Sequence, residues 1–304
     1  MANALLEAKP SLESAPRETE DDRPWQRVVA CYSAVDRFFP ACGLFDLTEG
    51  IYEGRPSTAF DTAKARQHDN LLDQVGCGPG HRLLDIGCGY GTLMQRARQR
   101  GGTVTGITVS PEQVRHCKQR HLDVHLLHYL AIPREWHGTF DAVIANGCIE
   151  HFVRPADVAS GRADDIYHRL FASVHRLIDP YSTSRMFATT TIHFVRKPKN
   201  PLDLLKSPFS FRWGSDEFHW SVLERGWGGY YPELRQLEQC AKGYYELSDE
   251  VDGTADYLLT SEEWVRRIRR AVRSPRLVKI AIESLPILVR FPRQFLALLM
   301  SVFL

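Results

Sequence analysis

The stretch "LLDIGCGYG" at residues 83–91 decides the fold of this chain. An apolar, strand-like run ends in Asp85, and Gly87, Gly89 and Gly91 then lead into a helical stretch. Glycines allow tight turns and a close approach of the backbone to a ligand, and open α/β sheets bind ligands beyond the carboxyl ends of their strands. The stretch therefore predicts a sheet strand followed by a ligand-binding loop.

Apolar, β-branched runs alternate with amphipathic helical stretches from residue 80 to residue 192. The strand-like runs are HRLLDIG, GGTVTGITV, LDVHLLHY, TFDAVIANG and SRMFATTTIHF. This alternation is typical of a parallel sheet with helices on both faces. Ser110 before Pro111 marks the start of one such helix, because serine caps helices and proline suits their first turn. The expected fold class is α/β, a doubly wound, Rossmann-like sheet.

The composition is that of a globular protein, with 43% hydrophobic and 25% charged residues. A formal net charge of +1 provides no strong field that would favour nucleic acid as a partner. The seven cysteines are scattered and form no C-x-x-C pair, which argues against disulfides or zinc and favours a cytoplasmic protein. Four histidines between residues 116 and 128 straddle a helix end and a strand, so no metal site is expected there.

The 304 residues divide into four predicted parts. Residues 1–24 are polar and acidic, lack a signal-peptide pattern and are expected to be a disordered tail. Residues 25–78 form a helical cap, 79–265 form the ligand-binding domain, and 266–304 form C-terminal helices. Within the domain, residues 194–232 are rich in aromatic side chains and could either roof an apolar pocket or carry a small core of their own.

Residues 266–304 alternate basic clusters with apolar runs. This pattern is typical of an amphipathic helix that touches anionic lipid, so peripheral membrane contact is one expectation. The alternative is that these helices pack on their own domain or on a second copy of the chain in a homodimer. No run approaches the roughly 20 apolar residues that span a bilayer.

Two classes of cofactor compete for the glycine loop. A dinucleotide site has the pattern G-x-G-x-x-G and an acid about 20 positions later that binds the ribose. Here Thr92 stands where the last glycine is expected, and residues 103–110 contain no carboxylate. Asp85 before a G-x-G-x-G loop suits S-adenosylmethionine, which carries an ammonium and a sulfonium group and no pyrophosphate. We therefore expect a class I methyltransferase, a tight turn that binds nothing being the alternative.

Other cofactor contacts are expected from neutral side chains. Because the second strand is not followed by an acid, Thr108, Ser110 and Gln113 are the candidates for binding the ribose. Tyr129 follows the third strand, where methyltransferases commonly contact adenine, and is a candidate for stacking on the base.

The fourth strand-like run ends in "ANGCIEHF" at residues 145–152, so Glu150 and His151 emerge at the predicted ligand-binding edge. We expect Glu150 to face the substrate and to take a proton, with His151 supporting it by hydrogen bonding. The alternatives are a glutamate favoured by the dipole at a helix start and a structural histidine.

Four stretches together resemble the cyclopropane-fatty-acid synthase family, which includes mycolic acid cyclopropane synthases. They are LLDIGCGYGTL, GGTVTGITVSPEQV, FDAVIANGCIEHF and ADYLLTSEEW. The likeness covers residues 30–265 approximately. It implies that the chain transfers a methyl group from S-adenosylmethionine to an alkene carbon of an apolar, lipid-like acceptor, through a carbocation that then loses a proton.

In the family that this chain resembles, the proton is typically taken by a bicarbonate held by a cysteine, a glutamate, a histidine and a tyrosine. Glu150 matches the glutamate and Tyr257 the tyrosine. Glu53 falls on the cysteine position and Thr189 on the histidine position. A second carboxylate would repel bicarbonate and could share a proton with Glu150. The resemblance thus leads to the hypothesis that Glu53 or Glu150 is itself the base.

Two other functions stay open at this point. The same fold could methylate a small acceptor such as an isoprenyl diphosphate, for which four basic residues could supply charge: Arg185, Arg196, Lys197 and Lys199. A cofactor-binding regulator without catalysis is the third hypothesis, and the intact loop beside Glu150 and Tyr257 argues against it.

Overall fold

The structure, a computed structural model, describes residues 26–194 and 196–303. The predicted disordered tail, residues 1–24, lies outside the described residues. One sheet of parallel strands in the order β3-β2-β1-β4-β5 forms the centre of the molecule. Its strands are β1 (Arg82–Ile86), β2 (Thr103–Thr108), β3 (Asp123–Leu126), β4 (Ala142–Asn146) and β5 (Met186–Thr190). The predicted doubly wound α/β fold is confirmed.

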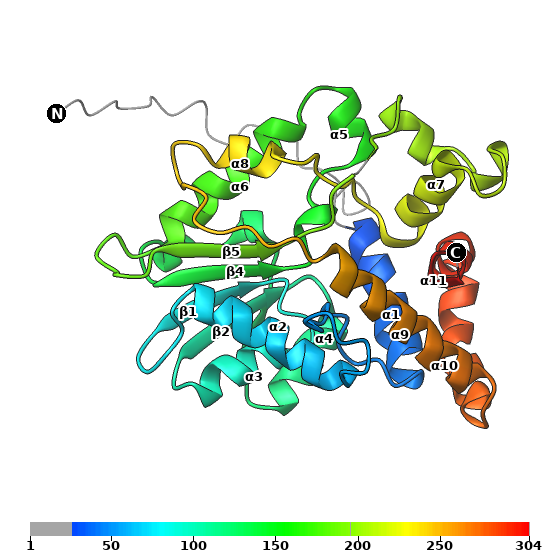
Figure 1. Cartoon of the computed structure of the whole chain (residues 1–304), viewed down its shortest axis with the longest axis horizontal. Coiled ribbons are helices and arrows are strands. Elements are labelled where there is room, and N and C mark those ends of the chain that lie inside the picture. The colour runs from blue at the N-terminus through cyan, green and yellow to red at the C-terminus, as the bar shows by residue number, and fades with distance from the viewer. Residues whose placement is uncertain (1–25, 195, 304) are drawn as a thin grey trace.

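Helices cover both faces of the sheet, with α2 and α3 on one side and α6 on the other (Figure 1). The helices of the described chain are α1 (Gln26–Ala41), α2 (Phe60–Gln74), α3 (Thr92–Gln99), α4 (Pro111–Gln119), α5 (Pro155–Ala159), α6 (Ala163–Leu177), α7 (Asp216–Trp227), α8 (Gln236–Ala241), α9 (Thr254–Val272), α10 (Arg276–Arg290) and α11 (Pro292–Phe303).

The central strand β1 sets the position of the ligand-binding edge. Asp85 pairs in register with Gly106 of β2 and with Ile144 of β4. Leu83 and Leu84 are fully buried between the two helical layers, as the apolar run predicts. Because all strands are parallel, the loops after β1, β2 and β4 meet at one edge of the sheet.

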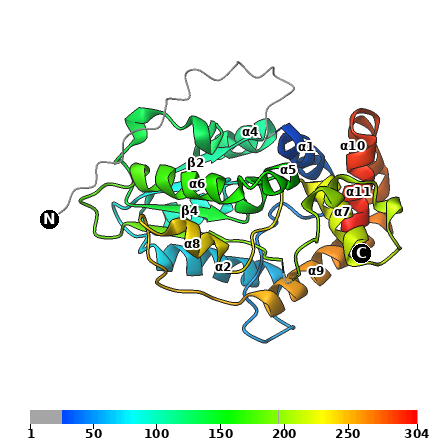
Figure 2. The same ribbon diagram turned by 90° about the horizontal axis from the view of Figure 1, so that it is seen from above.

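The N-terminal and C-terminal helices form a second core beside this edge. Phe38 and Phe39 of α1 pack with Ile280 and Ile287 of α10 and with Phe295 of α11. Both views place α10 and α11 at one end of the molecule, next to α1 (Figures 1 and 2). The basic C-terminal segment therefore packs on its own domain through one of its faces.

The aromatic-rich insert joins the core on the α6 side of the sheet. Leu204 and Tyr230 are buried in that core, and the Phe194 ring lies 4.8 Å from the Tyr230 ring. None of the described aromatic side chains of residues 194–232 lines the cavity described below. The insert therefore does not roof this cavity, and Leu204 and Tyr230 join the core of the domain and do not form a separate core of the insert.

All seven cysteines lie in the described part of the chain and are free thiols. Among the helices that the structure describes, none combines the length and the apolar character needed to cross a membrane.

Candidate active site

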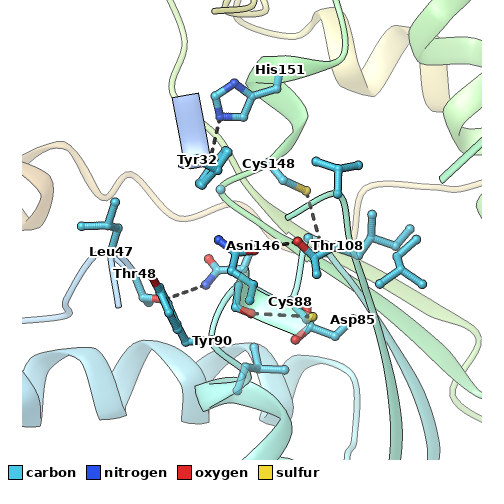
Figure 3. Close-up of a pocket in the computed structure, with 18 of the residues that line it drawn as sticks. Tyr32, Leu47, Thr48, Asp85, Cys88, Tyr90, Thr108, Asn146, Cys148 and His151 are labelled. Carbon is cyan, nitrogen blue, oxygen red and sulfur yellow. Dashed lines mark hydrogen bonds between the residues drawn. The ribbon is translucent and has the colours of Figure 1, made fainter. Parts of the chain in front are cut away.

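A cavity with a volume of about 190 Å³ lies at the carboxyl edge of the sheet, beneath α1. Its walls come from α1, the segment 46–49, the loop after β1, and the ends of β2 and β4. Figure 3 shows Tyr32 and His151 at one end of this cavity and Asp85 and Cys88 at the other. The predicted ligand-binding edge of the sheet therefore carries a cavity.

Most of the predicted cofactor-binding residues line this cavity: Asp85, Gly87, Gly89, Thr108, Gln113 and Tyr129. Gly91 and Ser110 do not. A Cβ atom on Gly91 would collide with Leu122, so this glycine serves the packing of the loop. Ser110 caps α4 by accepting a hydrogen bond from the backbone N–H of Gln113. Tyr129 stacks on Phe152 with ring centroids 4.2 Å apart, so one of its faces is covered by protein.

The glycine loop runs tightly against β4 and opens toward the cavity. Gly87 has φ +74°, and a Cβ atom there would lie 2.8 Å from Cβ of Cys148. Gly89 has φ +52°, and its Cβ position meets no atom within 4 Å. Only glycine fits the first position, whereas the second leaves free space beside the backbone, as a close-lying ligand requires.

Asp85 brings an unpaired carboxyl group to the cavity. Its side chain is 2% exposed, and Oδ2 has no hydrogen-bond partner. Burial, with Asp46 as the second cause, raises the pKa of Asp85 to about 7. A positively charged ligand would restore the ionised form. The ammonium and sulfonium groups of S-adenosylmethionine carry the positive charge that would stabilise the ionised form of Asp85.

The rest of the lining is also acidic. Asp46 and Glu49 line the cavity beside Asp85, and the described lining residues include no lysine or arginine. Burial lowers the pKa of both His128 and His151 to about 4, so these lining histidines are neutral near pH 7. The cavity therefore favours a cationic ligand over an anionic one, and its residues fit S-adenosylmethionine.

The carboxylate of Asp36, from α1, lies at the end of β2. Asp36 accepts hydrogen bonds from Tyr90 Oη at 2.8 Å, Ser110 Oγ at 2.5 Å and Gln113 Nε2 at 3.2 Å. Gln113 in turn accepts a 2.6 Å hydrogen bond from Thr108. The predicted ribose-binding set is thus held together by an acid that lies 74 residues before Ser110 and that was not predicted from the sequence.

Glu150 and His151 lie in the 3-10 helix η5 (Ile149–His151) directly after β4. Glu150 is 5% exposed; its Oε1 accepts a 3.0 Å hydrogen bond from the N–H of Ile192, and its Oε2 has no hydrogen-bond partner. Burial, with a contribution from Glu49, raises the pKa of Glu150 to about 7. Glu150 is not among the residues that line the cavity.

His151 differs from its prediction. Its Nε2 lies 3.1 Å from the hydroxyl group of Tyr32, and its Nδ1 has no hydrogen-bond partner (Figure 3). Neighbouring residues of a 3-10 turn point in different directions, which turns His151 toward α1 and away from Glu150. The expected support of Glu150 by a hydrogen bond from His151 is therefore wrong.

Glu53 is not beside Glu150. It is exposed, has φ +55°, and forms an ion pair with Arg66 at 3.1 Å. The residue that lines the cavity is Glu49, four positions earlier. Its Oε1 lies 3.6 Å from the position of a Cβ atom on Gly147, at the end of β4. Burial, with Asp46 as a further cause, raises the pKa of Glu49 to about 7.

Two sets of hydrogen bonds fix the segment that carries Glu49. Asn146 donates to Thr48 Oγ1 at 3.1 Å and links the segment to β4 (Figure 3). From the other side, the N–H of Gly50 donates to Thr260 Oγ1 of α9 at 2.9 Å. Both bonds hold Glu49 against the carboxyl edge of the sheet.

Tyr257 and Thr189 complete the surroundings of the two glutamates. Burial and the charges of Glu49 and Glu150 raise the pKa of Tyr257, so the phenol keeps its proton. Thr189 donates a 2.8 Å hydrogen bond to the carbonyl of Ala145 and offers no titratable group. The charges of Glu49 and Glu150, and not that of Glu53, thus act on Tyr257.

Comparisons with known proteins agree with this geometry. The sequence pattern of the family described as "Mycolic acid cyclopropane synthetase" matches residues 21–285. The chain is 27% identical over 222 residues to cyclopropane mycolic acid synthase 1 of Mycobacterium tuberculosis, covering 70% of this chain and 71% of that protein. It is 27% identical over 215 residues to cyclopropane-fatty-acyl-phospholipid synthase of Escherichia coli, covering 70% of this chain and 48% of that protein.

The fold is shared with solved structures. The cyclopropane synthase MmaA2 from Mycobacterium tuberculosis superposes with a TM-score of 0.66 at 20% identity, covering 91% of this chain and 94% of that chain. The family pattern spans most of the sequence, and the acidic, glycine-lined cavity fits the cofactor. The chain therefore belongs to the mycolic acid cyclopropane synthetase family and is an S-adenosylmethionine-dependent methyltransferase.

Proposed function

We propose that this enzyme transfers a methyl group to an alkene carbon of an apolar, lipid-like acceptor, and that Glu49 and Glu150 together take the proton that the product must lose. One observation supports the proposal: Glu49 lines the cofactor cavity, and its charge contributes to the raised pKa of the buried Glu150, which comes from a separate segment. Relatives of the chain are named for mycolic acids and for fatty-acyl phospholipids, which is consistent with such an acceptor.

S-adenosylmethionine, when bound, would supply an electrophilic methyl group and would leave as S-adenosylhomocysteine, which keeps the electron pair of the broken S–CH3 bond. The π electrons of an alkene form the new C–C bond, which leaves a carbocation on the second alkene carbon. A carboxylate beside this cation lowers its energy and accepts a proton from an adjacent C–H bond. The electron pair of that C–H bond then closes a three-membered ring or forms a new double bond.

The two glutamates divide this work according to their positions. Glu49 lines the cavity and is the group that a substrate proton reaches. Glu150 is not among the lining residues and is held by the N–H of Ile192. Because both pKa values are raised to about 7, each glutamate gives up its proton near neutral pH, and an ionised carboxylate is available as the base.

A base that belongs to the protein replaces a recruited anion in this proposal. Bicarbonate would meet Asp46, Glu49 and Asp85 in the cavity, and these groups repel an anion. The position of the family's histidine is held by Thr189, which has no charge to offset that repulsion.

The same electrostatics weigh against an isoprenyl diphosphate as acceptor. Arg196 and Lys197 are exposed and lie within 4 Å of Asp216 and Glu233, respectively, whereas Arg185 and Lys199 are exposed at the surface. None of the four lines the cavity. The lining instead offers an apolar acceptor contacts with five side chains: Val28, Val35, Leu47, Leu127 and Phe152.

The test offers the purified enzyme S-adenosylmethionine with a labelled methyl group, together with bacterial phospholipids and, in a parallel reaction, an isoprenyl diphosphate. The proposal expects label in the acyl chains of the phospholipids. Label only in the isoprenoid would overturn the lipid assignment. Cofactor binding without transfer to either acceptor would favour a non-catalytic regulator.

A further inference from the structure

Helix α10 has apolar side chains on two opposite faces. The inner face is buried against α1 and α11 through Ile280 and Ile287. The outer face carries four apolar side chains at the helical spacing i, i+4, i+7, i+11. This outer stripe consists of Val278, Ile282, Leu285 and Val289, which are 66, 65, 59 and 76% exposed.

Further exposed apolar side chains widen the outer stripe. Leu277 and Leu288 lie along one flank of the same helix, and Leu296 adds to the surface from α11. Single exposed leucines are ordinary on a protein surface, but a continuous row along one helix face marks a site of interaction. Both views place α10 and α11 at an outer end of the molecule, where no described element covers the stripe (Figures 1 and 2).

The C-terminal segment, residues 266–304, is strongly basic. Residues 266–304 contain nine basic residues and one acidic residue, Glu283, a net charge of +8 in a chain whose overall net charge is +1. Lys279 and Arg290 are exposed and, at i and i+11, lie on the flank of α10 opposite to Leu277 and Leu288. The same flank also carries Arg276 and Glu283, so basic residues outnumber the one acid beside the apolar stripe. An apolar stripe beside a predominantly basic flank is the pattern of a helix that lies in a membrane interface.

We propose that the outer face of α10 docks on a bilayer that contains anionic lipid. The outer stripe enters the boundary between headgroups and acyl chains, and Lys279 and Arg290 extend to the lipid phosphates. The net charge of +8 favours an anionic bilayer over a second copy of this chain, because two such faces would repel each other.

The docked face lies close to the active site. Val35 of α1 lines the cavity and belongs to the same packed cluster as Ile280 and Ile287 of α10. A single helix therefore separates the membrane-facing surface from the cofactor cavity. The inference concerns this surface alone and stands whether or not Glu49 is the base.

The test measures co-sedimentation of the full chain with vesicles of phosphatidylcholine, with and without phosphatidylglycerol. We expect binding to the vesicles that contain phosphatidylglycerol and its loss at high salt. The double variant Ile282→Ser/Val289→Ser should bind about tenfold more weakly. The control Leu234→Ser/Leu247→Ser removes two leucines that are 64 and 54% exposed outside the tail and should bind like the wild type.

A second set of variants tests the contribution of the basic residues to vesicle binding. Lys279→Glu/Arg290→Glu should weaken the preference for phosphatidylglycerol, whereas Arg169→Glu/Lys242→Glu, a reversal of exposed charges elsewhere, should keep it. Affinity for S-adenosylhomocysteine confirms that each variant is folded. Equal sedimentation of the stripe variant and the wild type, or no sedimentation of the wild type, would overturn the inference. A dimer that dissociates in the stripe variant without any lipid binding would assign the face to a second copy.

Discussion

Ser110 donates a 2.5 Å hydrogen bond to Asp36, so a carboxylate from α1 occupies the end of β2, where the β2 segment itself has no acid. Tyr32, one turn earlier on α1, lies 3.1 Å from His151 on the far side of the cavity. These two contacts hold α1 over the cofactor site, at the end of β2 and at the turn after β4. The N-terminal helix is therefore a wall of the active site.

Asp36→Asn should weaken binding of S-adenosylhomocysteine by about tenfold, which calorimetry would measure. A carboxylate accepts from Tyr90, Ser110 and Gln113 at once, whereas an amide presents an NH₂ group to one of these donors. The control Asp61→Asn changes an exposed aspartate of α2 and should bind like the wild type. Equal affinity in both variants would mean that Asp36 does not organise the ribose side of the cavity.

Gly87→Ala should lower the free energy of unfolding by about 2–3 kcal/mol, because strain at a positive φ adds to a clash with Cys148. Gly76→Ala is the matched control: it has φ +65° and no atom within 4 Å of the Cβ position. It should cost only about 1 kcal/mol, since backbone strain is its sole penalty. Urea unfolding of both variants measures the difference, and equal losses would contradict the close contact of the loop with β4.

The buried glutamates predict an unusual dependence of stability on pH. The pKa of Glu150 is raised from 4.5 to about 7, so the folded state favours the protonated form. This contribution to stability is complete below the unfolded pKa and is lost as the pH rises through the folded one. The neutral glutamine of Glu150→Gln does not ionise, so the variant keeps its stability as the pH rises. Its free energy of unfolding, relative to that of the wild type, should increase by up to about 3 kcal/mol between about pH 5 and about pH 8.

Chemical denaturation of the ligand-free protein across this range would measure that relative gain. Glu53→Gln is the control, because Glu53 is exposed and paired with Arg66 at the surface. Its stability relative to the wild type should stay constant. A Glu150→Gln variant that follows the wild type at every pH would show that Glu150 titrates as an ordinary surface glutamate.

The alternation of runs around Asp85 predicted the sheet, its covering helices and the edge that binds the cofactor, because these features depend on local patterns. Which of Glu49 and Glu53 reaches the cavity does not depend on local patterns. Both glutamates precede a glycine within "TEGIYEG", and family matching favours the second. What positions Glu49 is the hydrogen bond from Asn146 to Thr48 and the hydrogen bond from Gly50 to Thr260 on either side of it, and no local pattern reveals such distant partners.

Asp36 was missed for a related reason. The helical pattern of α1 shows which side chains are apolar, but it does not show that the helix crosses the end of β2. His151 lines the cavity, yet its partner depends on the direction of each side chain in η5. Residue type and approximate place were predictable; pairing across the cavity required the structure.

The most direct test of the central claim measures methyl transfer by Glu49→Gln and Glu53→Gln, each with and without added bicarbonate. If Glu49 and Glu150 carry the base, Glu49→Gln loses at least about a hundredfold in kcat while still binding S-adenosylhomocysteine, Glu53→Gln keeps wild-type turnover, and bicarbonate changes neither rate. The opposite pattern, with turnover that requires bicarbonate and survives Glu49→Gln, would show that the proton leaves to a recruited anion.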